Sequence, residues 1–269
     1  MAKLTKEEYA YSFGEYLKVS ESPKVTSEFL RTRLTAFLST RKSVKILSIG
    51  TGTGALDFAW TNQFNNHGLK EFSYTMLEPN PEFQAKLKNH LASHPDKDKF
   101  ELIESALETA DLTEKYDCIL VSHVFYYLKD RLESLKKIFS LLEKNGVAII
   151  IQYTPSGVYQ IHKKFLARLK GNDYEAFSCE DLVDLCDTLE KPYSYGLLRS
   201  TVNMTDCFEP DSKSGRAVLE FMVESKLDDL QLLNEVRRFA YDLTFEHQSN
   251  RLLYHPVGLV IIGSYETLT

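Results

Sequence analysis

The sequence predicts an α/β fold built on a largely parallel sheet with helices on both faces. Short apolar runs alternate along the chain with longer stretches of helical periodicity, which is typical of β-α-β units. The run Lys45–Ile49 is apolar and β-branched, as a buried parallel strand should be, and it leads directly into Gly50, Gly52 and Gly54. Glycines at these positions predict a tight turn into a helix, with a backbone that a bound group can approach closely.

Caps and breaks in the sequence set the bounds of the elements inside this fold. Asn80 and Pro81 predict the start of one helix, Asp130 starts another, and Asn145-Gly146 ends it. Strands are predicted near residues 45–50, 72–78, 99–103, 116–121 and 146–152, and the helices between them near 54–65, 81–93 and 130–143.

The two ends of the chain add further elements. Residues 7–38 are helical in pattern, and Ser22-Pro23 should divide them into two helices. Residues 156–192 are predicted to be mostly helical and to cover the ligand edge of the sheet. Apolar runs at 193–202 and 257–264 are predicted strands, and helices are expected near 213–226 and 228–246.

Composition excludes several classes of protein. The net charge of −6 and the absence of a basic patch argue against a nucleic-acid partner. Cys118, Cys179, Cys186 and Cys207 lack zinc spacing and indicate reduced thiols. Neither a signal peptide nor a run of about 18 apolar residues is visible, so we expect a cytoplasmic protein without a membrane partner.

Glu78 lies at the predicted tip of the second strand, in the position from which an acid accepts hydrogen bonds from ribose hydroxyls. Together with the glycine loop it predicts a cofactor that contains adenosine. Gly50, Gly52 and Ala55 also satisfy the dinucleotide pattern, so a nicotinamide cofactor is an alternative. A second alternative is that the glycines form a tight structural turn without a ligand and that Glu78 is exposed to solvent.

Ligands of such sheets bind outside the carboxyl ends of the parallel strands. This rule adds Ser105 and Ser122 as candidate cofactor contacts, because each follows or ends a predicted strand. The full set of strand ends is Gly50–Gly54, Glu78, Glu104–Ala106, Ser122–Tyr127 and Gln152–Gly157.

The spacing G-x-G-x-G followed by Leu77-Glu78-Pro79 resembles the S-adenosylmethionine-dependent methyltransferases of the Rossmann-like class. Within that class, Ile46–Gly50, Ser122–Asp130 and the stretch 197–208 resemble the histamine N-methyltransferase family in order and spacing. The likeness extends from about Tyr9 to Ile262 and so covers nearly the whole chain.

This resemblance implies a monomer with a Rossmann-like seven-stranded methyltransferase sheet, mostly parallel with an antiparallel last strand, and a smaller helical and strand region that covers the substrate. It implies transfer of a methyl group from S-adenosyl-L-methionine to a small-molecule acceptor, with the nitrogen of an amine or imidazole favoured. We expect a single domain, 1–269, with a helical cap at 1–40, a cofactor-binding core at 41–155, substrate-covering insertions at 156–256 and the final strand at 257–265.

The resemblance also assigns roles to residues. Gly50, Gly52 and Gly54 would contact the methionine part of the cofactor through their backbone, Glu78 would bind its ribose, and Ser122 would lie against it. In the family, aromatic residues line the pocket that binds the acceptor. The residues at matching places in this chain are Tyr9, Phe13, Tyr126, Tyr127 and Phe221. These aromatic residues can equally be core residues.

Departures from the family concentrate among the polar contacts to the acceptor. His123 replaces a glutamine, His255 stands in place of an asparagine, and His162 replaces a tryptophan. The acidic contact of the family aligns with Ser22, and the adjacent Glu21 is the candidate to replace it.

The three histidines have several possible roles. They can bind an amine or an anion, and His123 or His255 can be a general base, since an ordinary histidine pKa is about 6.5. A metal site is less favoured, and each can be a structural histidine. O-methylation of a phenol or acid by a histidine base, and an inactive cofactor-binding partner protein, are therefore alternatives to N-methylation.

Overall fold

The computed structural model describes residues 3–170 and 175–263. The chain divides into two compact units, which are described separately. We call the first the helical unit and the second the sheet unit. The helical unit comprises Met1–Val25, Tyr153–Ser178 and Leu197–Val257, and the sheet unit comprises Thr26–Gln152, Cys179–Gly196 and Gly258–Thr269.

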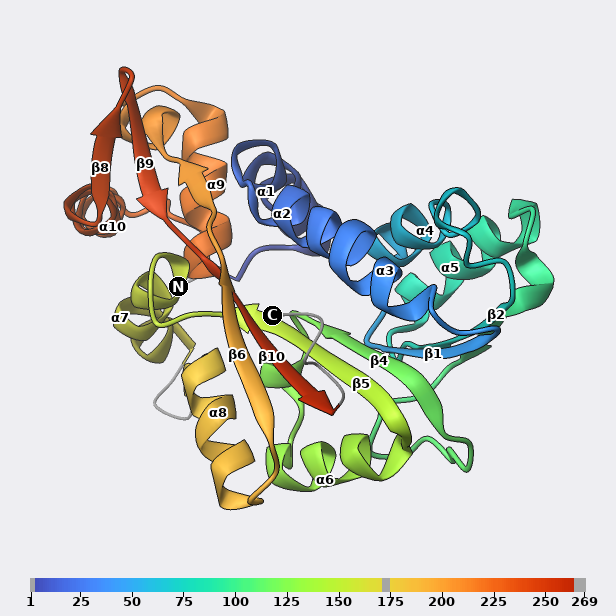
Figure 1. Cartoon of the computed structure of the whole chain (residues 1–269). Helices are drawn as coiled ribbons and strands as arrows, with labels where there is room; N and C mark the ends of the chain where they lie inside the picture. The colour runs from blue at the N-terminus through green and yellow to red at the C-terminus, as the bar shows by residue number, and fades with distance from the viewer. Residues whose placement is uncertain (1–2, 171–174, 264–269) are drawn as a thin grey trace. The chain divides into compact units, whose positions relative to one another are not determined.

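Within the described residues the main sheet has seven strands in the order β3-β2-β1-β4-β5-β10-β6 (Figure 1). Neighbouring strands from β3 to β5 pair in parallel, as the sequence predicts. Their bounds are β1 Val44–Ile49, β2 Phe72–Leu77, β3 Phe100–Ile103, β4 Tyr116–Ser122, β5 Leu142–Tyr153, β6 Tyr193–Leu198 and β10 Val257–Gly263.

The last strand, β10, runs antiparallel to its neighbour β5, which confirms the prediction (Figure 1). A Cβ on Gly258, at the start of β10, would lie 3.3 Å from the carbonyl oxygen of Gln152, near the end of β5. A Cβ on Gly263, at the other end of β10, would meet the carbonyl of Gly146, just before β5 residue Val147. The start of β10 therefore lies beside the end of β5, and the end of β10 lies beside an earlier part of β5.

Two helices of the sheet unit begin at the predicted caps. Asn80 accepts a hydrogen bond from the Glu82 N–H at 2.9 Å, and Asp130 accepts one from the Glu133 N–H at 2.9 Å. The helices are α2 Ser22–Phe29, which begins in the helical unit, α3 Thr35–Leu38, α4 Ala55–Thr61, α5 Pro81–Ser93, α6 Arg131–Leu141 and α8 Cys179–Thr188, with a π-helical stretch at Leu30–Leu34 and 3₁₀ turns at Asn65–His67 and Lys97–Lys99.

Two predicted bounds in this unit are wrong. α4 ends at Thr61 rather than near 65, and a short 3₁₀ turn follows it. β5 begins at Leu142, where a helix is predicted, because Leu142 pairs with Tyr116 before an irregularity that brings Val147 opposite Cys118. Asn145-Gly146 therefore forms part of this bulged strand instead of a helix end.

In its described residues, the helical unit packs four helices against a small antiparallel sheet of order β7-β9-β8. Its buried core is shared by α7, α9 and α10, with Ile161, Phe165, Leu219 and Val236 among the buried residues. The bounds are α1 Lys6–Val19, α7 Val158–Lys170, α9 Lys213–Val223, α10 Leu230–Asp242, β7 Thr201–Asn203, β8 Thr244–His247 and β9 Asn250–Tyr254.

The β8–β9 hairpin is absent from the predicted elements. Its turn residues, Gln248 and Ser249, have φ of 48° and 65°, in the left-handed region, although neither is a residue that typically signals such a turn. The predicted helix near 228–246 consequently ends at Asp242. Across the described part of the chain, every helix is too short or too polar to cross a membrane.

Candidate functional site

The carboxyl ends of the central strands are aligned by the register of the sheet. One row across it contains, from β2 to β5, Leu77, Ile49, Val121 and Ile150. The next residues along three of these strands are Glu78, Gly50 and Ser122. These predicted cofactor residues therefore lie at one edge of one sheet, where ligands of parallel α/β sheets bind.

All three loop glycines have positive φ, with values of 68° at Gly50, 62° at Gly52 and 76° at Gly54. A Cβ on Gly54 would lie 2.5 Å from the Phe58 ring, whereas a Cβ on Gly52 would have no atom within 4 Å. Gly54 is therefore required by packing within the protein. Gly52 leaves its backbone open to a ligand.

Glu78 is buried, with 4% of its surface exposed, which contradicts the alternative of a solvent-exposed side chain. One carboxylate oxygen accepts a hydrogen bond from the Gly52 N–H at 2.7 Å, and the other accepts one from the Asn80 N–H at 2.8 Å. Burial raises the pKa of Glu78, and these two N–H groups oppose the rise.

The arrangement at this edge fits an adenosine-containing cofactor. Each oxygen of a carboxylate has two acceptor positions, so Glu78 can bind ribose hydroxyls while it retains both N–H partners. Its bond to Gly52 also couples the position of the acid to the open part of the loop.

Ser105 and Ser122, the other predicted cofactor residues, differ in their surroundings. The Ser105 hydroxyl lies 2.8 Å from the Thr109 hydroxyl, so its side chain has a partner in its own loop. Ser122 is the last residue of β4 and pairs with Ile151 on β5. Ser122 is thus placed directly at the sheet edge.

His123 is the first residue beyond β4, and the chain changes direction there. Its φ is 54°, and its N–H donates to the Ile151 carbonyl at 2.7 Å. Burial lowers the pKa of His123 to about 4, so its imidazole is neutral at pH 7. The predicted aromatic pair follows in a 3₁₀ turn at Phe125–Tyr127, where the Tyr126 and Tyr127 ring centroids are 4.5 Å apart and Tyr127 is 67% exposed.

His162 and His255 lie in the helical unit and approach the same ring. The centroid of Tyr153 is 5.5 Å from that of His162 and 5.7 Å from that of His255. Burial, together with the neighbouring His255, lowers the pKa of His162 to about 3. Sequence reasoning did not assign a role to Tyr153, although an aromatic residue directly after a predicted strand is a usable signal.

His255 has a visible structural task at the start of α7. Its Nδ1 accepts a hydrogen bond from the Val158 N–H at 3.4 Å, and its own N–H donates to the Ser200 carbonyl at 3.0 Å. A neutral imidazole has one ring nitrogen that accepts and one that donates. Because Nδ1 accepts here, this contact fits the tautomer that carries its proton on Nε2.

Three residues of the predicted acceptor wall meet in the helical unit. Phe221 of α9 lies 5.8 Å from Tyr9 and 5.3 Å from Phe13 between ring centroids, and Tyr16 lies 4.5 Å from it. Tyr9 and Phe13 remain 39% and 40% exposed, while Phe221 is 9% exposed. These rings form a partly open aromatic cluster instead of a closed core. Tyr126 and Tyr127 belong to the sheet unit.

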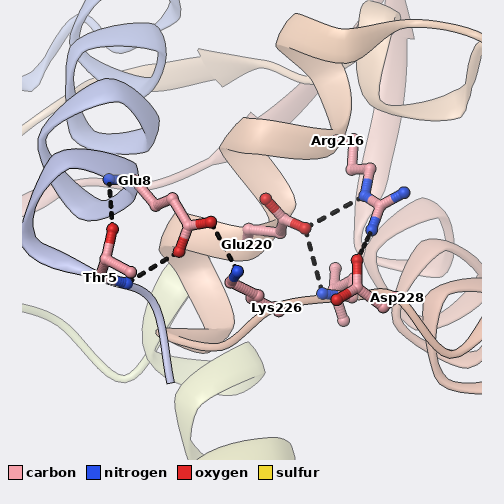
Figure 2. A network of polar contacts seen from close by, with 7 residues as sticks. Thr5, Glu8, Arg216, Glu220, Lys226 and Asp228 are labelled. Atoms are coloured by element: carbon pink, nitrogen blue, oxygen red, sulfur yellow. Dashed lines mark hydrogen bonds and ion pairs between the residues drawn. The ribbon is translucent and has the colours of Figure 1, made fainter. Parts of the chain in front are cut away.

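A polar network connects the start of α1 to α9 and to the segment that follows α9, as Figure 2 shows. Glu8 accepts hydrogen bonds from the Thr5 N–H at 2.8 Å and from the Lys226 ammonium at 2.6 Å. Arg216 extends the network through ion pairs with Glu220 and Asp228. The network holds the start of the helix that carries Tyr9 and Phe13.

Glu21, the predicted acidic contact to the acceptor, is bound to the small sheet of the helical unit. Its carboxylate accepts hydrogen bonds from the Thr201 N–H at 2.9 Å and the Thr201 hydroxyl at 2.8 Å. Ser22 lies 3.2 Å from the Ser200 hydroxyl. Among the described residues, no group of three or more His, Cys, Asp and Glu side chains is arranged to hold a metal ion.

Comparison with known proteins identifies the class. A family model described as a methyltransferase domain matches residues 24–188, more than half of the chain. The chain therefore belongs to the methyltransferase domain family. It is an S-adenosylmethionine-dependent methyltransferase, and the residues at its sheet edge fit that cofactor.

Curated relatives give a narrower likeness. The chain is 29% identical to histamine N-methyltransferase of Rattus norvegicus over 252 residues, which cover 86% of this chain and 85% of the relative. It is 23% identical to histamine N-methyltransferase of Danio rerio over 234 residues, covering 81% and 80% of the two chains. The predicted resemblance to this family is thus confirmed.

Solved structures agree on the fold. The YcgJ protein of Bacillus subtilis is similar with a TM-score of 0.59 at 12% identity, covering 86% of this chain and 96% of its own. The plantazolicin methyltransferase BpumL in complex with SAH is similar with a TM-score of 0.54 at 14% identity, covering 96% and 91%. Both likenesses confirm the predicted methyltransferase sheet.

Proposed function

We propose that this protein transfers a methyl group to a nitrogen atom of a small amine or imidazole compound, with histamine as the first compound to test. The observation that carries the proposal is the likeness to histamine N-methyltransferases over 86% of this chain and 85% of the relative. S-adenosylmethionine supplies an activated methyl group, so the protein contributes mainly binding and alignment.

Aromatic faces support a nitrogen acceptor. Tyr9 and Phe13 are partly exposed beside Phe221, and aromatic faces attract cations. An amine acquires positive charge as it is methylated, so such faces would stabilise the developing charge. Tyr126 and Tyr127 are proposed to serve the same purpose from the end of β4.

The histidines support binding of a nitrogen compound more than deprotonation of a phenol. With a pKa of about 4, His123 is a weak base toward a phenol, whose ordinary pKa is about 10. A neutral His123 can instead accept a hydrogen bond from an N–H group of the acceptor. We propose this role for His123, and binding rather than base roles for His162 and His255.

Glu21 has a narrower possible role. Both hydrogen bonds from Thr201 go to Oε2 of its carboxylate, so Glu21 can offer Oε1 to a further donor. It can therefore bind a protonated amine without leaving the Thr201 segment. We further propose that the enzyme acts as a monomer, which light scattering of the purified protein would test.

The test is a methylation assay with purified protein, S-adenosylmethionine and a panel of imidazoles, primary amines and phenols, read by mass spectrometry. An N-methylated product from histamine or another amine is expected. Methylation of phenols alone would favour the histidine-base alternative. Cofactor binding by calorimetry without turnover of any panel compound would favour the inactive partner protein.

A further inference from the structure

Gln152 is a buried amide at the carboxyl end of β5. It is 0% exposed, and within residues 3–170 and 175–263 neither its side-chain oxygen nor its side-chain nitrogen has a hydrogen-bond partner. A buried polar atom without a partner destabilises the folded state, because it has lost its hydrogen bonds to water. Because most buried polar groups are paired, an amide with two unpaired atoms requires a physical reason.

The position of Gln152 supplies that reason. It lies two residues beyond Ile150, the β5 member of the row that contains the last residues of β1 and β2. Side chains alternate along a strand, so Gln152 and Ile150 share a face of the sheet. His123 lies directly beside it in the fold, because the His123 N–H donates to the carbonyl of Ile151.

Other unpaired groups in the sheet unit differ from Gln152. The hydroxyl of Ser134 is also buried without a partner among the described residues, but Ser134 lies in the first turn of α6, on a helix and not at the end of a strand. A serine hydroxyl is also one small group, whereas the amide of Gln152 offers both a donor and an acceptor. Among the residues that the structure describes, only Gln152 combines an unpaired amide with a place at the ligand edge.

We propose that the amide of Gln152 binds the polar group of the methyl acceptor and helps to select it. The amide can donate to a nitrogen lone pair or accept from an N–H or O–H group, so the ligand is a small molecule that presents a neutral polar group of this kind to Gln152. This inference rests on the methyltransferase activity and deepens the proposed function.

The test compares Gln152→Met with the wild type in steady-state kinetics, using the panel compound that the wild type methylates fastest. Methionine retains the length and the approximate volume of glutamine and removes the amide. We expect the KM for the acceptor to rise about three- to tenfold, as for one or two neutral hydrogen bonds. The Kd for S-adenosylmethionine should change less than twofold, and Tm should stay constant or rise.

Ser134→Ala is the matched control, since it removes a buried unpaired hydroxyl from a helix and leaves the strand ends unchanged. It should leave Tm unchanged or higher and the acceptor KM unchanged. An unchanged acceptor KM in Gln152→Met would overturn the inference. A lower Tm with equal losses in cofactor and acceptor binding would also overturn it, because it would show a partner inside the fold.

Gln152→Asn provides a second variant if Gln152→Met folds poorly. It keeps the amide but withdraws it by one methylene, so the acceptor KM should rise while Tm stays near that of the wild type. The role of Gln152 and the proposed specificity for a nitrogen acceptor can fail independently of each other. If the wild type methylates a phenol instead of an amine, nitrogen specificity fails, and the Gln152 variants are assayed with that phenol.

Discussion

The cofactor edge of the sheet unit and the aromatic cluster of the helical unit are built in different ways. Gly50, Gly52, Gly54 and Glu78 come from one stretch of chain, and backbone N–H groups hold the acid. The cluster joins Tyr9 and Phe13 of α1 to Phe221 of α9, which is some 200 residues away in sequence. The first depends on backbone conformation and the second on side-chain packing between distant segments.

This difference predicts how each region responds to substitution. Backbone conformations with positive φ tolerate few side chains, so small changes in the glycine loop should have large effects. Partly exposed rings retain neighbours when one of them is removed, so changes in the aromatic cluster should alter acceptor binding with little loss of stability.

The largest effect is expected for Gly54→Ala. A Cβ there would lie 2.5 Å from Phe58 and 2.7 Å from Leu87, at a φ of 76°. Strain and overpacking together should lower the free energy of unfolding by about 2–5 kcal/mol. Urea denaturation measures this loss.

Gly52→Ala is the matched variant, because its Cβ would have no atom within 4 Å. It should lose only the roughly 1–2 kcal/mol of left-handed strain but bind S-adenosylmethionine at least tenfold more weakly. Equal destabilisation by the two variants would show that the loop is not divided into a packed and an open part.

Glu78→Gln should weaken S-adenosylmethionine binding about 10- to 150-fold, the range for hydrogen bonds to a charged group. Calorimetric titration measures the Kd, and Glu101→Gln, an exposed position on β3, serves as the control. The same affinity in wild type and variant would exclude Glu78 as the ribose ligand.

The pH dependence of cofactor binding sharpens this prediction. Burial raises the pKa of Glu78 above the ordinary glutamate pKa of 4.5, so on acidification its carboxylate takes up a proton at a higher pH than an ordinary carboxylate does. Cofactor affinity should therefore begin to fall on acidification before an ordinary carboxyl would titrate. For stability the sign is opposite, because a raised folded-state pKa means that protonation favours the folded state. Titrations at several pH values, with Glu78→Gln as the pH-independent reference, measure the effect.

His123→Asn should raise the acceptor KM about three- to tenfold and leave the Kd for S-adenosylmethionine unchanged, as expected for one neutral hydrogen bond. Asparagine is chosen because it tolerates the left-handed conformation at this position, where φ is 54°. A loss of about 100-fold or more in kcat would instead indicate a general base.

Local sequence predicts the cofactor edge well for a physical reason. The strand, the glycines and Glu78 lie within about 35 residues, and their spacing follows from the geometry of one β-α-β unit. The caps at Asn80 and Asp130 are equally local, and the structure confirms both. The antiparallel last strand was predicted through family resemblance, since no local pattern sets strand direction.

The remaining features depend on long-range contacts. The early start of β5 at Leu142 follows from its pairing with Tyr116, which local helix signals cannot show. The bond from the Val158 N–H to His255 joins residues 97 positions apart and gives that histidine a structural partner. In the sequence Gln152 is a polar residue at the end of a predicted strand, and its unpaired amide is visible only once the fold has buried it.

Phe13→Ala tests the aromatic cluster itself. We expect the acceptor KM to rise about two- to tenfold, because one aromatic contact contributes about 0.5–1.5 kcal/mol. Tm should fall only slightly, since the ring is 40% exposed. Phe37→Ala, on α3 in the sheet unit, is a control that should leave the acceptor KM unchanged. A similar rise in both variants would contradict a role for the cluster in acceptor binding.

The smallest effect is expected for Lys226→Met, which breaks the ion pair with Glu8 (Figure 2). Exposed ion pairs contribute little, and Glu8 retains its bond to the Thr5 N–H, so α1 should remain helical. Tm should fall slightly at low salt and match the wild type at 1 M salt, where such pairs are screened. The double reversal Glu8→Lys with Lys226→Glu should restore part of the loss, although the reversed lysine cannot cap α1. A different result would be a rise in the acceptor KM of Lys226→Met as large as that of Phe13→Ala. The ion pair would then control the position of the aromatic cluster, and side-chain contacts at the start of α1 would affect acceptor binding as much as the rings that α1 carries.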